Sequence, residues 1–333
     1  MKQADVAREY RKRFPDMPTL ALARKMYAEN HLMFTNLESA RSVLRNIAGK
    51  NGKANIPKVN TEFIETEPRP YNPYNIPESD ETDYPVFEIK GGRIGLMSDI
   101  HAPFHSISAI SAAIEYYIKN PIDTLVINGD FFDFYGGSRF LKDPRKRKMS
   151  EEIDIGCELL KVLQKELGCK IIFKYGNHDE RFEHYLWQKV QEIPQLADMH
   201  EIQNLNLEQA LKTRIPDLNF EVIDKKRLID FCGLTILHGH EMGGSVFSPV
   251  NIARGLFLRG GESGVCGHHH QTSEHTQPTS RGRMVTTWSL GCLCELNPDY
   301  LPINKWNHGF AYVEGEGAEY HMKNMRILKG KIL

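Results

Sequence analysis

The 333-residue chain has no long hydrophobic run, and no segment approaches the roughly 18 consecutive apolar residues of a membrane-spanning helix. Its first residues, MKQADVAREYRKRFPD, include no apolar stretch of the kind found in a secretory signal peptide. The six cysteines form no CxxC pair and show no disulfide-like spacing, which is typical of reduced thiols. We therefore expect a cytoplasmic protein without a membrane segment.

Internal repeats and low-complexity tracts are also lacking. Hydrophobic residues (41 %) and charged residues (26 %) occur in the proportions of an ordinary globular protein, which excludes fibrous and disordered classes. A chain of this length can bury a full core, either as one large domain with an appendage or as two medium domains.

The net charge of −1 hides an uneven distribution. Residues 1–60, the basic head, carry twelve Lys and Arg against five Asp and Glu, whereas the rest of the chain carries 30 against 38. A basic head on an acidic body indicates a polyanionic partner for the head. A solvated helical surface explains the same charges, so both interpretations stay open.

Two short helices are expected within residues 1–50. LALARKMYAEN, which follows Thr19, is rich in strong helix formers. In the next helix Thr35 and Glu38 have the spacing of a capping box, and Gly49 supplies a stop. The apolar residues of this second helix recur at helical spacing on one face: Leu37, Ala40, Leu44 and Ile47.

Two such helices joined by a tight turn resemble a helix-turn-helix, with Arg41 and Arg45 on the outer face of the second helix. A small helical cap that packs on the main domain is the alternative. Residues 1–50 are thus predicted to form a helical domain, with nucleic-acid binding as one of two interpretations.

The chain changes character twice after this domain. Residues 51–86 hold six prolines and show little periodicity, which predicts a linker or an extended arm because proline fixes φ and interrupts helices. From residue 87, short apolar runs alternate with helical segments. These segments are residues 106–119, 151–167 and 180–192. The alternation predicts an α/β domain over residues 87–333, in which ligands bind at the carboxyl ends of the strands.

Five of the apolar runs are followed by loops that carry Asp, Asn or His. The runs are RIGLM, DTLVI, KIIFKY, LTIL and GVC. The residues that follow them, in order, are Asp99 and His101; Asp130 and Asp133; Asn177 and His178; His238 and His240; and His268, His269 and His270. One such fragment is weakly specific, but five in this order, each after a strand-like run, predict a metal centre.

Spacing indicates how these residues share an ion. In an extended chain residues i and i+2 face the same side, so Asp99 and His101 can bind one ion. The same spacing relates His268 and His270, and His269 between them should point the other way. Carboxylate, amide and imidazole ligands without a thiolate suit Mn²⁺, Fe or Zn²⁺ better than a structural zinc.

The motifs D-x-H, GD-x-x-D, GNHD, a further His and GH-x-H, in this order, resemble the calcineurin-like metallophosphoesterase family over residues 87 to about 315. The resemblance implies a four-layer α/β/β/α sandwich whose two sheets carry two divalent metal ions, with Mn²⁺ as the first choice. The ligands carried over are Asp99, His101 and His270 for one ion, Asn177, His238 and His268 for the other, and Asp130 as the bridge. His238 is preferred over His240, the other histidine of the HGH triplet.

The family's reaction implies direct attack on phosphorus by a hydroxide held between the two ions. His178 corresponds to the histidine that protonates or stabilises the leaving oxygen; Asp133 would orient it, with Asp179 as a competing partner. Arg181 is a candidate for phosphate contact, and a salt bridge at a helix start is the alternative. The stretch TTWSLGCLCELNPDY (286–300) is predicted to be an inner strand followed by a loop near the site, with no catalytic residue.

The motifs of the family do not indicate which phosphate ester is the substrate. The basic head and the basic block 145–148 favour nucleic acid or a nucleotide, although a solvated insertion explains the block as well. Phe134 and Tyr135 stand where phosphoprotein phosphatases of this superfamily carry Arg-Gly, which weakens the phosphoprotein alternative. A DNA-binding regulator on an inactive scaffold is the alternative from another class, and the complete set of ligand positions argues against it.

Overall fold

The computed structural model of the chain describes residues 2–49, 74–77, 83–138, 148–192, 205–223, 226–243 and 250–333. It divides into two units, Met1–Glu81 and Thr82–Leu333, each with its own core. Most of the predicted arm, 51–86, and residues 145–147 of the basic block lie outside the described residues. No helix within the described part is long and apolar enough to cross a membrane.

The first unit contains three helices where the sequence predicts two. They are α1 (Gln3–Arg13), α2 (Thr19–Glu29) and α3 (Leu37–Ile47). Their shared core is Val6, Ala7, Leu22, Ala23, Met26, Phe34, Ala40 and Leu44. The prediction is short by one helix because α1, QADVAREYRKR, is mostly charged and buries only Val6 and Ala7, too few to show a helical period.

The start of α3 also differs from the prediction. Asn36, not Thr35, is the N-cap, and its side-chain oxygen accepts the backbone N–H of Ser39 at 2.8 Å. Residues 30–36 separate α2 from α3, more than the three or four residues of a helix-turn-helix turn. The capping box at Thr35 and the tight turn are therefore both wrong.

The larger sheet of the second unit has seven strands in the order β13-β12-β11-β2-β3-β4-β5. The strands are β2 (Gly92–Met97), β3 (Thr124–Asn128), β4 (Lys170–Lys174), β5 (Phe220–Ile223), β11 (His308–Glu316), β12 (Glu319–Leu328) and β13 (Lys331–Ile332). Strands β2 to β5 are parallel, and β3 and β4 are buried along most of their length. Burial on both faces explains why these strands appear in the sequence as continuous apolar runs.

The smaller sheet has six strands in the order β1-β6-β7-β8-β10-β9. They are β1 (Phe87–Ile89), β6 (Ile229–Phe231), β7 (Leu234–Leu237), β8 (Gly264–Cys266), β9 (Ser273–Pro278) and β10 (Met284–Ser289). Strand β10, which contains TTWS, lies between β8 and β9, so the predicted inner strand is confirmed.

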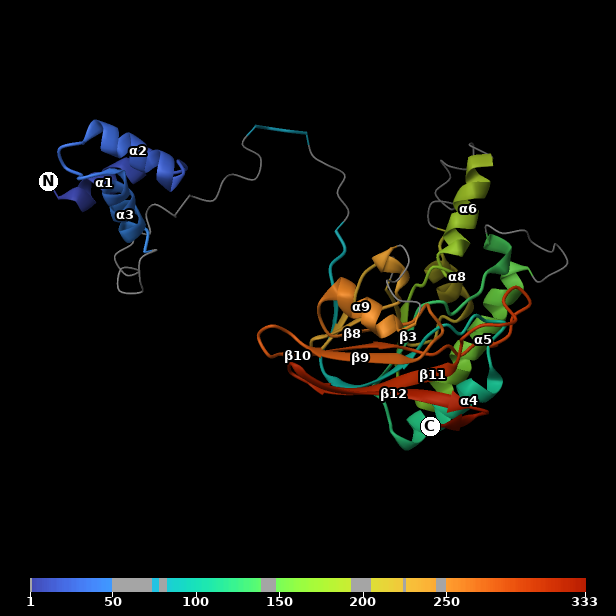
Figure 1. Cartoon of the computed structure of the whole chain (residues 1–333). Coiled ribbons are helices and arrows are strands. Elements are labelled where there is room, and N and C mark those ends of the chain that lie inside the picture. Colours follow the sequence, from blue (N-terminus) through green and yellow to red (C-terminus); the bar gives the residue numbers. More distant parts are fainter. Residues whose placement is uncertain are drawn as a thin grey trace. The chain divides into compact units, whose positions relative to one another are not determined.

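Helices cover the outer faces of both sheets. A buried cluster between the sheets takes Leu96 and Val126 from one and Ile236 and Val265 from the other. The outer face of the larger sheet packs against α4 (Ile107–Lys119), α5 (Met149–Leu167) and α8 (Leu207–Arg214). Helix α9 (Ile252–Gly260) lies beside β8, β9 and β10 of the smaller sheet (Figure 1). The predicted four-layer α/β/β/α sandwich is confirmed.

Candidate metal centre

The loops after β2, β3, β4, β7 and β8 bring the predicted side chains together at one edge of the two sheets. Backbone hydrogen bonds join the loops after β2 and β3: the N–H of Asp99 donates to Gly129 O at 3.1 Å and that of His101 to Asp130 O at 3.0 Å. The N–H of His268, after β8, donates to the Asp99 carboxylate at 3.0 and 3.1 Å. The two sheets are therefore tied together at the ligands themselves.

The backbone of these loops is not extended, contrary to the prediction. Five predicted ligands have φ between 49° and 67°: Asp99, His101, Asp130, His268 and His270. Residues other than glycine rarely adopt this left-handed conformation, and its clustering is typical of functional sites. The argument from i and i+2 spacing is wrong for both pairs, because the chain turns sharply at each ligand. Close approach also requires glycine at 176, where a Cβ would overlap the carboxylate of Asp130.

Asp99, His101 and His270 lie together and form the first set of candidate ligands. His270 Nε2 lies 3.1 Å from Asp99 Oδ1 and 3.2 Å from His101 Nε2. The two imidazole nitrogens that face each other cannot both carry a proton, whereas a cation would satisfy both. This arrangement of acceptor atoms suits a metal ion.

Asn177, His238 and His268 are the candidates for the second set. The ligand atoms of His238, His268 and the carboxylate of Asp130 lie within 4.8 Å of one another. Asn177 Oδ1 and His268 Nδ1 are buried without a hydrogen-bond partner among the described residues. Buried polar atoms without a partner are rare, and these are atoms that would bind an ion. The residues present therefore fit a second metal ion.

Asp130 lies between the two sets. Its Oδ2 is 3.3 Å from His238 Nε2 and 3.8 Å from His101 Nε2. Its Oδ1 accepts the backbone N–H of His178 at 2.8 Å, which holds the carboxylate in this orientation. A carboxylate in this position reaches both sets, as a bridging ligand must.

The charges of the centre are strongly coupled. Burial alone would lower the pKa of His238 and His270, but the carboxylate of Asp130 raises that of His238, and the carboxylate of Asp99 that of His270, each to about 10. Burial, and then the charge of His238, lower the pKa of His268 to about 4. The metal-free centre therefore balances its carboxylates with protons that a metal ion would displace.

Asp133 contacts two histidines of the centre. Its Oδ1 lies 3.2 Å from Nδ1 of His101 and 3.2 Å from Nδ1 of His178. The carboxylate thereby orients both rings, so that Nε2 of His101 faces the ligand sets. Burial would raise the pKa of Asp133, but the two histidines hold it below its usual range. The predicted pairing of Asp133 with His178 is present, and the contact with His101 was not foreseen.

Asp179 is not a partner of His178, contrary to the alternative drawn from the sequence. Its carboxylate accepts the backbone N–H groups of Gly176 at 2.8 Å, Phe132 at 3.0 Å and Phe131 at 3.4 Å. Asp179 thus joins the loops after β3 and β4. Burial, and then the charge of Asp130, raise the pKa of this carboxyl to about 7.

Arg181, the first residue of α6 (Arg181–Glu192), points into the centre. Its Nη1 donates to Asp133 O at 2.9 Å and its Nη2 to His178 Nε2 at 2.7 Å. His178 Nε2 therefore accepts a hydrogen bond, and the proton of the neutral ring is on Nδ1, 3.0 Å from Asp133 O. These bonds differ from the salt bridge at a helix start that was the alternative, and they place the guanidinium beside the catalytic histidine candidate.

The two histidines of the HGH triplet separate. His238 faces Asp130, whereas His240 Nε2 lies 3.3 Å from Glu180 Oε1. Glu241 holds this loop, because its carboxylate accepts the backbone N–H of His238 at 3.0 Å and that of Gly239 at 2.6 Å. The structure therefore brings the first histidine of the triplet, and not the second, to the ligand sets.

A buried ion pair supports that loop. Lys174, at the end of β4, is fully buried, and its Nζ lies 2.8 Å from Glu241 Oε1. Burial would raise the pKa of Glu241, but Lys174 lowers it to about 2. This pair was not predicted, although a lysine inside the apolar run KIIFKY is a detectable signal.

His269 belongs to neither ligand set, although its ring stands edge-on to that of His268, with ring centroids 5.0 Å apart. Its ring lines a small cavity with Met242, Ile252 and Leu256, beside α9. His268 and His270 belong to the two different ligand sets. The three consecutive histidines thus have three different environments.

The segment after β10 contributes contacts that the sequence analysis missed. Cys294 Sγ lies 3.9 Å from His270 Nδ1, on the side of the ring away from Asp99. The ring of Trp306 lies 4.1 Å from that of His270, at an interplanar angle of 59°. No short-range sequence pattern predicts these contacts, because the contacts depend on how the two sheets pack.

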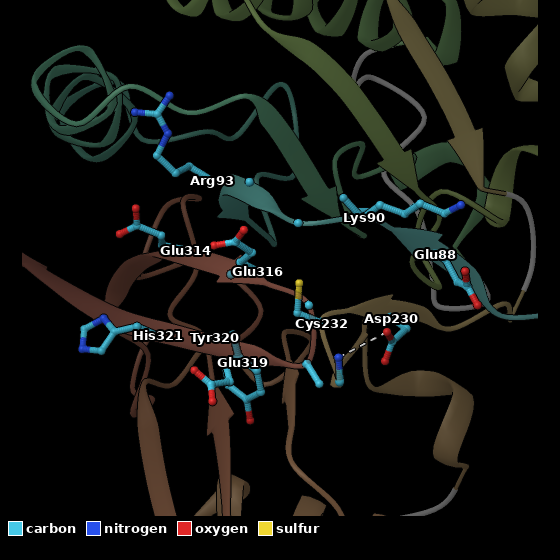
Figure 2. Close-up of a pocket in the computed structure, with 17 residues that line it drawn as sticks. Glu88, Lys90, Arg93, Asp230, Cys232, Glu314, Glu316, Glu319, Tyr320 and His321 are labelled. Atoms are coloured by element: carbon cyan, nitrogen blue, oxygen red, sulfur yellow. Dashed lines mark hydrogen bonds between the residues drawn. The ribbon is translucent and has the colours of Figure 1, made fainter.

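A cavity of about 1430 Å³ lies at the other end of the strands. It is lined by the start of β2, the β6–β7 turn and the β11–β12 turn (Figure 2). Its acidic side chains outnumber Lys90 and Arg93; they are Glu88, Asp230, Glu314, Glu316 and Glu319. An excess of carboxylates does not suit a phosphate ester, so this cavity is not part of the candidate centre.

Solved structures similar to this chain include Vps29 of Entamoeba histolytica in complex with Zn²⁺ (13 % identity, TM-score 0.38), covering 72 % of this chain and 96 % of that one. Vps29 of Cryptosporidium parvum is also similar (13 % identity, TM-score 0.39), covering 74 % of this chain and 96 % of that one. So is YfcE, a phosphoesterase from E. coli (15 % identity, TM-score 0.30), covering 66 % of this chain and 87 % of that one. Likeness at this level says nothing about substrate. No curated protein sequence matches the chain.

The family comparison is more specific. Residues 92–277 match the model of the calcineurin-like phosphoesterase family, a shorter span than the 87 to 315 predicted but more than half of the chain. The matched span includes all the ligand positions described above. With this match, the two-sheet fold and the Asp and His clusters, the chain belongs to the calcineurin-like phosphoesterase family, and it is a metal-dependent phosphoesterase.

Proposed function

We propose that this protein hydrolyses phosphate mono- or diesters of nucleic acid or nucleotides, with two divalent metal ions, Mn²⁺ first and Fe or Zn²⁺ as alternatives. The observation that carries the proposal is the position of Asp130 between the two ligand sets. Asp99, His101 and His270 would hold one ion, and Asn177, His238 and His268 the other. Bound there, the pair of cations would supply Lewis acidity toward the phosphate and lower the pKa of water.

In this proposal His178 gives a proton to the leaving oxygen. Its Nε2 now accepts from Arg181, so a proton can sit on Nε2 only when the guanidinium turns away. A phosphate group is a stronger partner for a guanidinium than a neutral imidazole. Substrate would therefore draw Arg181 onto a phosphate oxygen and free Nε2 of His178, while Asp133 Oδ1 lies 3.2 Å from Nδ1 of the same ring.

The choice of a nucleic-acid or nucleotide substrate is supported by charge and by one departure from the phosphoprotein phosphatases. The head is basic, and Arg45 on α3 is exposed. Phe134 and Tyr135 replace the Arg-Gly of the phosphoprotein enzymes. Phe134 is buried and stacks on Phe132 at 4.9 Å, so this loop has an apolar role in place of a cationic one.

The enzymatic part of the proposal is tested with the metal-loaded full chain. We expect turnover of bis-p-nitrophenyl phosphate with Mn²⁺, and loss of both bound metal and turnover in Asp130→Asn. An inactive wild type, or an Asp130→Asn variant as active as the wild type, would contradict the proposal. An inactive wild type that still bound DNA would favour the regulator alternative.

The substrate is tested with labelled single- and double-stranded DNA, a nucleotide panel and phosphopeptides. Preference for phosphopeptides would overturn the substrate assignment. The role of the head is tested by Arg45→Glu, which should weaken DNA binding, with a matched control at exposed Lys165 on α5 (Lys165→Glu). If both variants bind DNA as the wild type does, the head is a solvated surface.

A further inference from the structure

The segment between β10 and β11 presents two aromatic rings beside the metal centre. Trp306 lies against His270, with ring centroids 4.1 Å apart. Tyr300 is 72 % exposed, and its ring lies 6.4 Å from that of Trp306 at an interplanar angle of 65°. An aromatic surface therefore begins at a metal-ligand candidate and continues into solvent.

Hydrogen bonds join the segment to the loop after β8 and also form within the segment. Asn307 donates its backbone N–H to His270 O at 2.9 Å, and its side-chain oxygen accepts the N–H of Thr272 at 2.8 Å. Asn304 accepts the N–H of Trp306 at 2.8 Å and donates to Leu301 O at 2.9 Å. A surface that is already ordered loses little conformational entropy when a ligand binds.

Tyr300 also lies within the electrostatic field of the centre. Partial desolvation, and then the negative charge of Asp133, raise the pKa of its phenol to about 12, and Arg181 opposes this shift. The phenol is therefore neutral at physiological pH, and the exposed ring presents an uncharged face. Large rings that remain exposed beside a polar centre are typical of ligand contacts.

We infer that Trp306 and Tyr300 form a stacking surface for the base of a nucleotide whose phosphate is bound at the metal centre. The inference rests on the proposed function and names the part of the substrate that this chain recognises. In a nucleotide only a sugar separates the phosphate from an aromatic base, whereas a phosphorylated Ser or Thr carries no ring. Because every base has a π face, such a surface would accept all four bases.

The test compares substrates that differ in the base. A nucleoside monophosphate is paired with glycerol phosphate, and a dinucleotide with glycerophosphoethanolamine, all with Mn²⁺. Trp306→Ala should raise KM about tenfold for the two substrates with bases and leave the ring-free pair unchanged. Trp306→Phe should restore most of the affinity, Tyr300→Ala should act in the same direction, and Ile303→Ala, 90 % exposed in the same segment, should have no effect.

Binding gives a second readout. A nonhydrolysable nucleoside phosphonate should quench the tryptophan fluorescence of the wild type, and Trp306→Phe should remove most of that quenching. Unchanged KM values in Trp306→Ala and Tyr300→Ala, or a KM that rises equally for ring-free substrates, would overturn the inference, because Trp306 would then only support His270. If the wild type hydrolyses neither pair, the proposed function fails. The quenching by the phosphonate then shows, independently of activity, whether the stacking surface binds a base.

Discussion

His268, His269 and His270 are adjacent in the chain, yet only His268 and His270 join the ligand sets, each a different one. His268 joins Asp130 and His238, and His270 joins Asp99 and His101, whereas His269 lines a cavity beside α9. The cause is the left-handed backbone at His268 and His270, with φ of 67° and 56°, which turns the chain at each of them. At the scale of single residues, the direction of a side chain depends on backbone conformation more than on sequence spacing.

This separation predicts different outcomes for three alanine variants. His268→Ala and His270→Ala should each lose bound metal and turnover, because each removes a ligand that no neighbour replaces. His269→Ala should keep both, with at most a small loss of stability from its half-buried position. Metal analysis and bis-p-nitrophenyl phosphate turnover measure the effects, and loss of metal from His269→Ala would contradict the assignment.

His178 and Asp130 should also respond differently to substitution. His178→Gln removes a proton donor but no ligand, so kcat should fall by about 10²-fold or more at unchanged metal content. Asp130→Asn should lose metal together with activity. If His178→Gln has the metal content of the wild type and also its kcat, His178 is not the acid; parallel metal analysis of the two variants makes the comparison.

Between β4 and the loop after β7, the pair Lys174–Glu241 joins the two sheets behind His238. Lys174→Met leaves Glu241 buried without its partner and should lower the free energy of unfolding by about 3–5 kcal/mol. Apparent metal affinity should fall as well, because the backbone at His238 loses its support. Denaturant unfolding and metal titration measure the two effects.

Lys170, on the same strand, supplies the matched control. It pairs with Glu221 at the surface, where both side chains are more than 40 % exposed. Lys170→Met should cost less than about 1 kcal/mol, because exposed pairs are weak. Equal losses in the Lys170 and Lys174 variants would show that burial does not decide the contribution of these pairs.

For the molecule as a whole, the metal centre couples stability to pH. In the metal-free protein the pKa values of His238 and His270 are raised from the ordinary 6.5 to about 10. Groups whose pKa is raised by folding stabilise the protein fully below pH 6.5, and this contribution is lost as the pH rises toward 10. The free energy of unfolding of the metal-free protein should therefore fall between pH 7 and 8.5, by up to about 1.4 kcal/mol per pH unit for each histidine.

Bound metal should reverse this dependence. A cation replaces the two protons, so the apparent metal affinity should rise with pH, and the metal-loaded protein should not lose stability over the same interval. Urea unfolding at several pH values, with EDTA and with excess Mn²⁺, measures both. A metal-free protein that becomes more stable as the pH rises from 7 to 8.5 would contradict the assignment of protons to these histidines.

The amino-acid sequence alone determined the α/β class, the strand ends and the identity of the candidate ligands. These features follow from local chemistry, because an apolar run followed by Asp, Asn or His is visible within about ten residues of chain. Even so, locally weak signals were missed, as at α1, whose charged surface hides its short buried face.

Only the tertiary structure decided which atoms meet. His101 and His270 are 169 residues apart, and their contact exists because the two sheets pack face to face with the ends of these strands at the same side. The same holds for Lys174 with Glu241, and for Trp306 with His270. Residue types and their spacing can be read from the sequence, but the distance between two side chains on different sheets is set by the packing of the whole core.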